Sequence, residues 1–321
     1  MLSPLRFKPL FRQYIWGGRR LQTVLGKEIG EGDDYAESWE VVDHGKDQSV
    51  VQFGEHAGLT LHDLVTRYGE QLLGIHHPQQ QFPLLFKFLD ANRNLSVQVH
   101  PNDEQGARLQ PPDAGKTEAW VILEAVQGSK IYAGLRNDVN RNTFVQAVKD
   151  NRIESCLHVI EPKIGDCLFI PAGTVHALGN GLVVAEIQQA SDTTFRIFDW
   201  NRVGSDGCPR QLHIQAAMSV IDFEMGPIHP QMPMPTDHHG ISRLVESDKF
   251  VLDRWSFNQP QYLPDTSRCQ ILMVVSGSVH VENDPAKIPL GRGDTMLIPA
   301  CAKEVRVEPR DTAVLLRTYL P

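Results

Sequence analysis

The segment Leu95–Glu118 reads LSVQVHPNDEQGARLQPPDAGKTE, and the interpretation of the remaining chain rests on it. Apolar and polar residues alternate at its start, a pattern that predicts a β-strand. Because residues i and i+2 of a strand point to the same face, Gln98 and His100 project together. Glu118 follows the histidine by eighteen positions and heads the next apolar run. We therefore expect an amide, an imidazole and a carboxylate near one another.

A second histidine follows another short apolar strand. The sequence FIPAGTVH (Phe169–His176) comes directly after a Gly-Asp turn. Together with Gln98, His100 and Glu118, His176 completes a donor set that suits a divalent metal, with zinc first and then manganese, iron, cobalt or nickel. A structural or solvated role is commoner for a lone histidine, but four donors in this arrangement favour ligation.

Length and charge limit the partners. The chain has 321 residues, a formal net charge of −8, 41% hydrophobic residues and 22% charged residues. This length allows two domains, or one large domain with additions. The negative charge argues against a nucleic-acid or membrane-surface partner, because both select for positive surfaces. A local basic pocket can still bind a small anion.

The sequence contains no sign of export or membrane insertion. No apolar stretch reaches the length of a signal-peptide core at the start or of a membrane span later. The five cysteines are scattered and lack CxxC spacing. We expect them to be reduced thiols in a cytoplasmic protein.

Hydrophobic periodicity predicts many short strands and few helices. Leu59–Leu73 has apolar residues at helical spacing, with Thr60 as the N-cap, and Asn142–Asp150 and Leu212–Phe223 are predicted as further short helices. Residues 82–100 contain two apolar runs around a polar turn, the pattern of a β-hairpin. Short strands with glycine and proline turns favour jelly-roll barrels over a parallel α/β sheet.

An internal repeat indicates two related barrels. GDCLFIPA (Gly165–Ala172) returns as GDTMLIPA (Gly293–Ala300), and no histidine follows the second copy. The predicted fold is therefore all-β, with a few short helices. A proline- and histidine-rich passage, Gly226–Gly240, marks the expected boundary. We predict a catalytic domain over residues 1–230 and a barrel without ligands over residues 231–321.

The motifs resemble a known enzyme family. The strand with Gln-x-His, the later glutamate and the pattern GDxxxIPAGTxHAL are similar to the arrangement in cupins, so both jelly-roll barrels are expected to be of cupin type. Four longer motifs closely resemble the type I mannose-6-phosphate isomerases, in particular their short bacterial branch. They are PLLFKFLDANRNLSVQVHP (83–101), GKTEAW (115–120), PAGTVHAL (171–178) and EIQQASDTTFRIFDWNR (186–202). The resemblance runs from about Arg12 to Phe223 and is weaker over the C-terminal barrel.

This resemblance implies a role for each matching position. The zinc ligands of the family fall on Gln98, His100, Glu118 and His176. Its catalytic arginine falls on Arg196, and its other active-site positions fall on Lys87, Lys116, Glu186, Asp192 and Ser96, the last of which helps to hold phosphate. Arg202 stands where longer relatives have a phosphate-binding lysine, which keeps the charge but changes the donor geometry.

The implied reaction interconverts mannose 6-phosphate and fructose 6-phosphate by moving a proton between C1 and C2 through an enediol, with one zinc ion per chain. The cations would stabilise the enediolate and bind the dianionic phosphate. Crowding of like charges would lower the pKa values of the lysines. We expect Arg196 to face the enediolate and Lys116 or Glu186 to carry the proton. Asp192 is a further candidate, and the residues alone do not choose among them.

Other assignments stay open at the level of the residues. An isomerase for another sugar phosphate, such as glucose 6-phosphate, and a non-catalytic sugar-phosphate-binding cupin both fit the motifs, whereas a cupin dioxygenase would leave the basic cluster unexplained. Asp192 and Arg196 could form a plain surface ion pair, and Lys87 could protect an edge strand. The expected partner is a small sugar phosphate rather than nucleic acid or a membrane, for a monomer or a homodimer.

Overall fold

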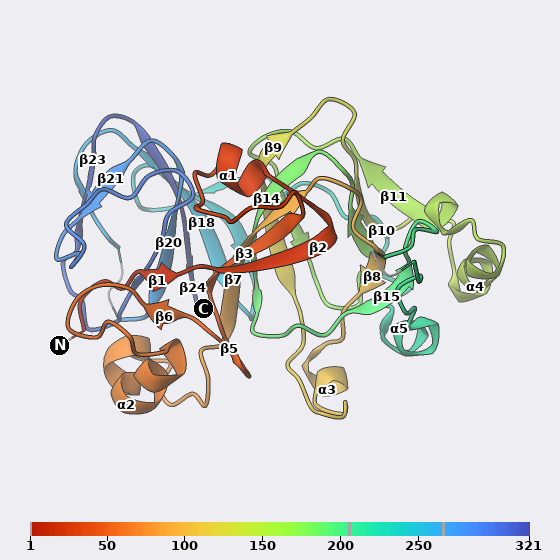
Figure 1. Ribbon diagram of the computed structural model, residues 1–321, viewed down its shortest axis with the longest axis horizontal. Coiled ribbons are helices and arrows are strands. Elements are labelled where there is room, and N and C mark those ends of the chain that lie inside the picture. The colour runs from red at the N-terminus through yellow and green to blue at the C-terminus, as the bar shows by residue number, and fades with distance from the viewer. Residues whose placement is uncertain (1, 205–206, 265–266) are drawn as a thin grey trace.

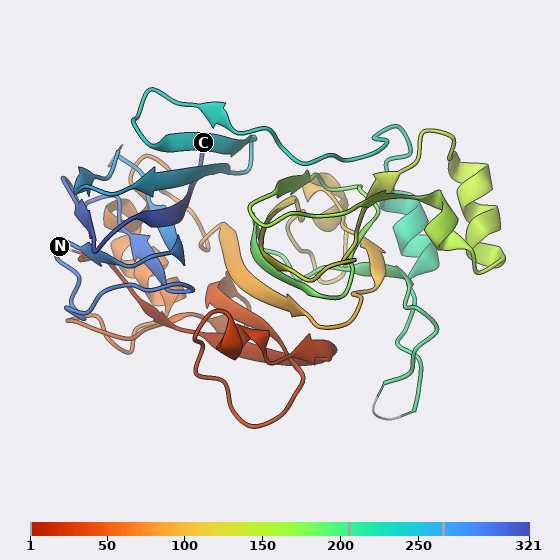
Figure 2. The same cartoon turned by 90° about the horizontal axis from the view of Figure 1, so that it is seen from above.

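The computed structural model of the protein describes residues 2–204, 207–264 and 267–321. The paired strands of these residues are all antiparallel, and few short helices join them, so the chain is all-β. Two units lie side by side, and each contains a six-stranded sheet and a smaller sheet (Figure 1, Figure 2). Among the described residues, no helix is both long and apolar enough to cross a membrane.

The first unit pairs a six-stranded sheet with a five-stranded sheet. In spatial order, the larger sheet contains β12 (Cys167–Ile170), β9 (Glu118–Ala125), β14 (Leu182–Gln189), β7 (Leu84–Ala91), β3 (Tyr35–Val41) and β2 (Leu10–Gly18). The smaller contains β11 (Leu157–Ile160), β10 (Ile131–Leu135), β13 (His176–Leu178), β8 (Val97–Val99) and β15 (Phe195–Phe198). Their facing sides share one hydrophobic core, in which Trp120 and Val184 meet Ile131 and Leu178.

The second unit repeats this plan. Its six-stranded sheet contains β16 (Met234–Pro235), β17 (Ile241–Glu246), β18 (Val251–Phe257), β24 (Ala313–Tyr319), β20 (Gln270–Ser276) and β22 (Thr295–Ile298). Its three-stranded sheet contains β19 (Gln261–Tyr262), β23 (Arg306–Pro309) and β21 (Val279–Val281). The two copies of the sequence repeat form β12 and β22, each at an end of its large sheet. The repeat therefore has a structural counterpart.

Short elements connect the sheets. Two small sheets pair β1 (Phe7–Lys8) with β6 (Val50–Val51) and β4 (Asp43–His44) with β5 (Asp47–Gln48). The helices are α1 (Arg20–Thr23), α2 (Leu61–Leu73), α3 (Asp103–Gly106), α4 (Arg141–Lys149), the 3₁₀ helix η1 (Ile153–Cys156) and α5 (Ile214–Val220). The N-cap predicted for α2 is confirmed, because the Thr60 hydroxyl accepts a hydrogen bond from the amide of Asp63 at 3.0 Å.

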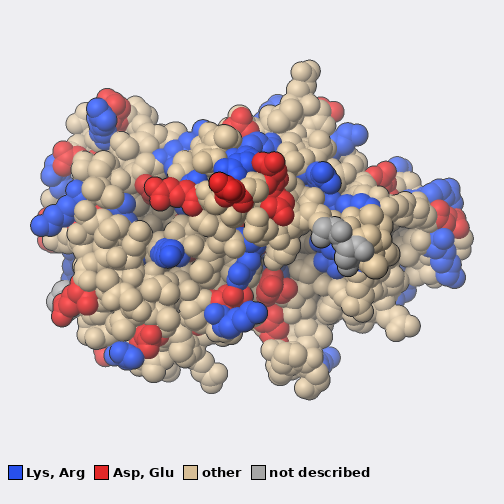
Figure 3. All heavy atoms as spheres, in the orientation of Figure 1, with Lys and Arg blue, Asp and Glu red and all other residues tan. Residues whose placement is uncertain are grey.

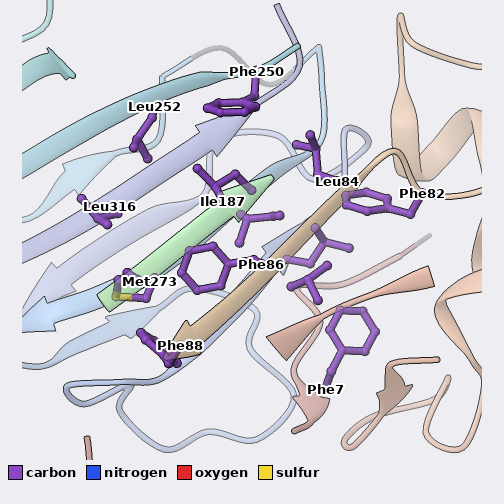
Figure 4. Packing of buried hydrophobic residues seen from close by; sticks show 14 of the residues in the cluster. Phe7, Phe82, Leu84, Phe86, Phe88, Ile187, Phe250, Leu252, Met273 and Leu316 are labelled. Atoms are coloured by element: carbon purple, nitrogen blue, oxygen red, sulfur yellow. The ribbon is translucent and has the colours of Figure 1, made fainter. Parts of the chain in front are cut away.

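The two six-stranded sheets pack against each other through their outer faces (Figure 4). Phe86 and Phe88 of β7 lie in the same hydrophobic cluster as Phe250 and Leu316 of the second unit. Lys87 alternates with these phenylalanines, and it lines a cavity inside the first unit. Because both faces of this sheet are covered, all eight residues of β7 are buried. A polar residue on the strand is therefore costly unless it has a partner or a function.

The division of the chain at residue 230 stays a prediction. The sheets of the first unit are formed by residues before position 230, and those of the second unit by residues after it. The hydrophobic cluster between the units, however, contains residues of both units. The N-terminal residues also bind the second unit, because Leu5 and Leu297 exchange backbone hydrogen bonds of 2.8 and 2.9 Å. The second unit thus supports the outer face of the sheet that carries Lys87.

The hairpin predicted for residues 82–100 is wrong. Its two runs form β7 and β8, which lie in different sheets. β7 has antiparallel partners on both sides, β14 and β3, and so has no free edge for β8. The polar turn between the runs instead carries the chain from one sheet to the other.

Charge is mixed over the surface. On the face drawn in Figure 3, basic and acidic side chains lie next to one another, and the acidic ones gather across the middle. Positive charge that could bind a small anion has to come from a local group of residues.

Candidate metal centre and active-site cavity

Three side chains of the predicted metal site meet in the interior of the first unit. His100 directly follows β8, Glu118 begins β9 and His176 begins β13. β8 and β13 are neighbours, and His176 lies opposite Gln98 in their register. His100, Glu118 and His176 are each 1% exposed, and one possible ligand atom from each lies within 4.8 Å of the others. The two sheets of the first unit therefore bring together residues that are far apart in sequence.

The hydrogen bonds of both imidazoles direct their free nitrogens to the Glu118 carboxylate. The Nε2 atoms of His176 and His100 lie 3.3 and 3.6 Å from its oxygens. On the other side of each ring, Nδ1 lies 2.9 Å from a backbone carbonyl, that of Thr174 for His176 and that of Thr193 for His100. A carbonyl can only accept, so Nδ1 carries the proton and Nε2 presents a lone pair. Ligation of a metal needs this tautomer.

The charge state of the site also fits a cation. Burial, followed by the charge of Lys116, lowers the pKa of His176 to about 3 and the pKa of His100 well below its ordinary value. Both rings are therefore neutral near pH 7. The Lys116 ammonium lies 2.6 Å from Glu118 Oε2 and 3.0 Å from His100 Nε2, so the donor set already attracts a positive charge. Two neutral imidazoles and one carboxylate fit a divalent metal.

Gln98 lies at the edge of this centre. Its amide nitrogen is 3.5 Å from Nε2 of His100 and 3.4 Å from Nε2 of His176, and its oxygen accepts a hydrogen bond from the Ser96 hydroxyl at 3.2 Å. A half-turn of the amide would exchange the two atoms. A fourth ligand at Gln98 stays a prediction.

A cavity of about 290 Å³ opens beside the centre. The sequence-predicted residues that line it are Lys87, Ser96, Gln98, Lys116, Glu118, His176, Glu186, Asp192 and Arg196. Arg202 and His100 are not among the lining residues. Tyr14, Glu37 and Arg210 line the cavity too, and sequence reasoning missed them. The structure thus collects nearly all of the predicted residues around one space.

Lys87 is held between carboxylates rather than among cations. It lies opposite Glu186 in the register of β7 and β14, and its ammonium is 3.6 Å from Glu186 and 3.4 Å from Glu37. Burial lowers the pKa of Lys87, but the charges of Glu186 and Glu37 outweigh burial and raise it. The expected lowering is therefore wrong for Lys87, because acidic neighbours dominate. A role on an edge strand is excluded as well, because β7 is paired on both sides.

Glu186 has the environment of a proton carrier. It is 3% exposed, and its Oε1 has no hydrogen-bond partner in the described part of the chain. The ammonium groups of Lys87 and Lys116 lie 3.6 and 3.7 Å from this oxygen. Burial raises the pKa of Glu186, and the charge of Lys87 lowers it less. This carboxyl group can therefore hold a proton at a higher pH than an ordinary glutamate.

Arg196 enters the cavity from β15. Its Nε donates to the Ser96 hydroxyl at 3.3 Å, and its Nη1 donates to the carbonyl of Gln211 at 2.9 Å. These contacts, rather than the surface ion pair with Asp192, hold the guanidinium in the described structure. Burial, followed by the charge of Arg210, lowers the pKa of Arg196. Two guanidinium groups thus lie near each other at this side of the cavity.

Arg210 and Arg202 lie side by side and share one carboxylate. Both bind Asp199, whose Oδ1 lies 2.7 Å from Arg202 Nη2 and 2.6 Å from Arg210 Nη2, but only Arg210 lines the cavity. A β-bridge between Val203 and Pro209 returns the chain, so that Arg210 comes back beside Arg202. In the sequence, only the glycines at positions 204 and 207 could have indicated that the chain returns before Arg210.

A double-sheet antiparallel unit with a buried His-Glu-His centre defines a cupin-type protein with a candidate metal site. Residues 5–148 match the catalytic domain of phosphomannose isomerase type I. The chain is 33% identical over 320 residues to mannose-6-phosphate isomerase ManA of Bacillus subtilis, covering 95% of this chain and 96% of that protein. It is 32% identical over 305 residues to mannose-6-phosphate isomerase of Streptococcus mutans, covering 94% of each chain. The chain belongs to the type I phosphomannose isomerase family and is an isomerase of that family.

Solved structures agree with this assignment. The crystal structure of mannose 6-phosphate isomerase from Bacillus subtilis superposes with a TM-score of 0.90 at 28% identity and covers 99% of both chains. A variant of phosphomannose isomerase from Salmonella typhimurium superposes with a TM-score of 0.78 at 18% identity and covers 99% of this chain and 100% of that one. The second likeness concerns the fold alone.

Proposed function

We propose that the protein interconverts mannose 6-phosphate and fructose 6-phosphate with the help of one zinc ion. The observation that carries the proposal is the buried set of His100, Glu118 and His176 beside a cavity with arginines in its wall. Membership of the isomerase family supports the reaction, and the cation-attracting donor set supports the cofactor. His100, Glu118 and His176 would hold the ion, with Gln98 as the candidate fourth ligand. When bound, the ion supplies positive charge that polarises the oxygens of the substrate.

The reaction moves one proton between C1 and C2 through an enediol, so it needs a group that can release and regain a proton. We assign this step to the pair of Glu186 and Lys116, whose charged atoms lie 3.7 Å apart and face the cavity. The raised pKa of Glu186 favours it as the group that holds the proton. Lys87 is suited to keep its charge and to bind hydroxyl groups of the sugar, together with Asp192.

The arginine side of the cavity is suited to the phosphate. Arg196, Arg202 and Arg210 contribute three positive charges and Asp199 one negative charge, which leaves +2 for a dianion. Arg196 and Arg210 line the cavity, and the Ser96 hydroxyl lies beside Arg196. Planar guanidinium groups bind phosphate oxygens in pairs. From this position, Arg196 can also stabilise the negative charge of the enediolate.

A coupled assay that detects fructose 6-phosphate formed from mannose 6-phosphate tests the proposal. We expect turnover that EDTA abolishes and that added Zn²⁺ restores, and little turnover with glucose 6-phosphate. The His176→Ala variant should lose activity that Zn²⁺ does not restore. A metal-loaded wild-type protein that binds the sugar phosphate without turnover would identify a binding module instead. Equal or faster turnover of another sugar phosphate would assign a different substrate.

A further inference from the structure

Asp113 is the centre of a hydrogen-bond cluster outside the cavity. It lies in the loop between α3 and β9, and its Oδ2 accepts hydrogen bonds from the hydroxyls of Thr193 at 2.6 Å and Ser191 at 2.8 Å. Its Oδ1 accepts from the amide of Ala114 at 2.8 Å and lies 3.1 Å from Nε2 of His44. One carboxylate thus joins its own loop to β4 and to the segment that follows β14.

That segment reaches the metal centre through its backbone. Thr193 binds Asp113 with its hydroxyl, and its carbonyl accepts the Nδ1 proton of His100 at 2.9 Å. Residues 191–193 lie between β14 and β15, so no strand ladder fixes this carbonyl. The amide of Asp192 also faces Asp113, at 3.3 Å from Oδ2, and its side chain lines the cavity. Side-chain hydrogen bonds to Asp113, together with one from the Gln188 amide to the Ser191 carbonyl at 2.6 Å, anchor this stretch of backbone, and only those to Asp113 involve Thr193.

We propose that Asp113 is a positioning residue of the metal centre. Its hydrogen bonds hold residues 191–193 against the loop before β9, so that the Thr193 carbonyl faces His100. That carbonyl accepts the Nδ1 proton of His100, which leaves the Nε2 lone pair directed at the metal. The inference rests on the proposed ligand role of His100. Loss of the partner to which a ligating histidine donates weakens metal binding by about 10- to 100-fold. Here that partner is the Thr193 carbonyl, and Asp113 acts on His100 through it.

Asp103, the first residue of α3, also binds this loop and provides a matched control. Asp103 accepts hydrogen bonds from the amide of Gly115 at 2.9 Å and from the side chain of Gln189 at 2.8 Å, and it pairs with Lys249 at 2.8 Å. It fastens the loop about as firmly as Asp113, but it does not bind residues 191–193. A residue that merely stabilises the loop should behave like Asp103.

Zinc affinity of the full-length protein, measured by competition with a chelator, separates the two roles. We expect Asp113→Ala to weaken Zn²⁺ binding about 10- to 100-fold, and Asp103→Ala to change it by less than about threefold. Thr193→Val cuts the link between Asp113 and His100 and should act in the same direction as Asp113→Ala. His44→Ala removes a partner on the far side of Asp113 and should leave Zn²⁺ affinity unchanged.

A second readout does not depend on metal. Nitrogen NMR of metal-free protein should show His100 protonated at Nδ1 in the wild type and a mixture of tautomers in Asp113→Ala. If Asp113→Ala fails to fold, Asp113→Asn and Thr193→Val serve in its place. Unchanged zinc affinity with an unchanged tautomer in these variants would overturn the inference. If the wild type bound no zinc, the proposed metal site would fail, and the tautomer alone would decide whether Asp113 positions His100.

Discussion

Arg210 and Arg202 share one carboxylate, so alanine variants of the two test which arginine binds the phosphate. Asp199 Oδ1 lies 2.6 Å from Arg210 and 2.7 Å from Arg202. In either variant Asp199 keeps one arginine partner, so neither substitution leaves a buried carboxylate without a partner. The two changes are therefore matched at Asp199, whereas Arg202→Ala also loses a hydrogen bond to the carbonyl of Asn94. They differ in the cavity, which Arg210 lines and Arg202 does not.

The size of the effect follows from the charges. The group of Arg196, Arg202, Arg210 and Asp199 has a formal charge of +2, which falls to +1 in either variant. A hydrogen bond to a charged group contributes about 1.5–3 kcal/mol, or roughly 10- to 150-fold in affinity. We expect Arg210→Ala to raise KM for mannose 6-phosphate by this factor, with a smaller change in kcat. Arg202→Ala acts only at a distance and should change KM by less than about threefold.

Steady-state kinetics of both variants with mannose 6-phosphate provide the measurement. Inorganic phosphate should compete with the substrate in the wild type, and its inhibition constant should rise in Arg210→Ala by a factor similar to that in KM. Thermal unfolding of the two variants provides the control for folding. Equal KM values in the two variants, or a larger rise in Arg202→Ala, would refute the assignment of the phosphate to Arg210.

Three further predictions concern the proton carrier, the histidines and the packing between units. Glu186→Gln should lower kcat by about 100- to 10,000-fold, because an amide cannot release and regain the proton; a variant that keeps wild-type kcat contradicts the assignment. Burial lowers the pKa of His176 from 6.5 to about 3, so the metal-free folded state binds fewer protons than the unfolded state between these values. The stabilising contribution of His176 should be present above pH 6.5 and be lost as pH falls towards 3. Denaturant titrations should therefore show a free energy of unfolding that depends less on pH in His176→Gln than in the wild type. Phe86→Ala should lower the free energy of unfolding by about 3–5 kcal/mol, because this side chain is 1% exposed between the units. Calorimetry of the wild type should show one shared unfolding transition, and two separate transitions would contradict a common core.

The sequence predicted the residues of the site well where the signal is local. Strand alternation placed Gln98 and His100 on one face, and the motifs along the chain added Glu118 and His176. The structure brings His100, Glu118 and His176 together, and the ligand role of Gln98 stays a prediction. The repeat of Gly165–Ala172 likewise indicated a second unit of similar plan. These features depend on neighbouring residues, which a single sequence displays directly.

The missed features depend on contacts between distant residues. β7 and β8 do not form a hairpin, because β7 already has partners on both sides. The pKa of Lys87 is raised rather than lowered because Glu186 on the neighbouring strand and Glu37, fifty positions earlier, reach the same space. Arg210 enters the cavity only through a bridge that closes a turn. No periodicity or motif in one sequence specifies such neighbours.

X-ray absorption of the zinc-loaded, full-length protein examines the proposed metal site itself. We predict one zinc ion per chain with two imidazole nitrogens at about 2.0–2.1 Å and oxygen from a carboxylate. His176→Ala should lose one imidazole from this shell. Substoichiometric zinc after removal of excess metal, or a bound ion without histidine ligands, would contradict a metal centre at His100, Glu118 and His176.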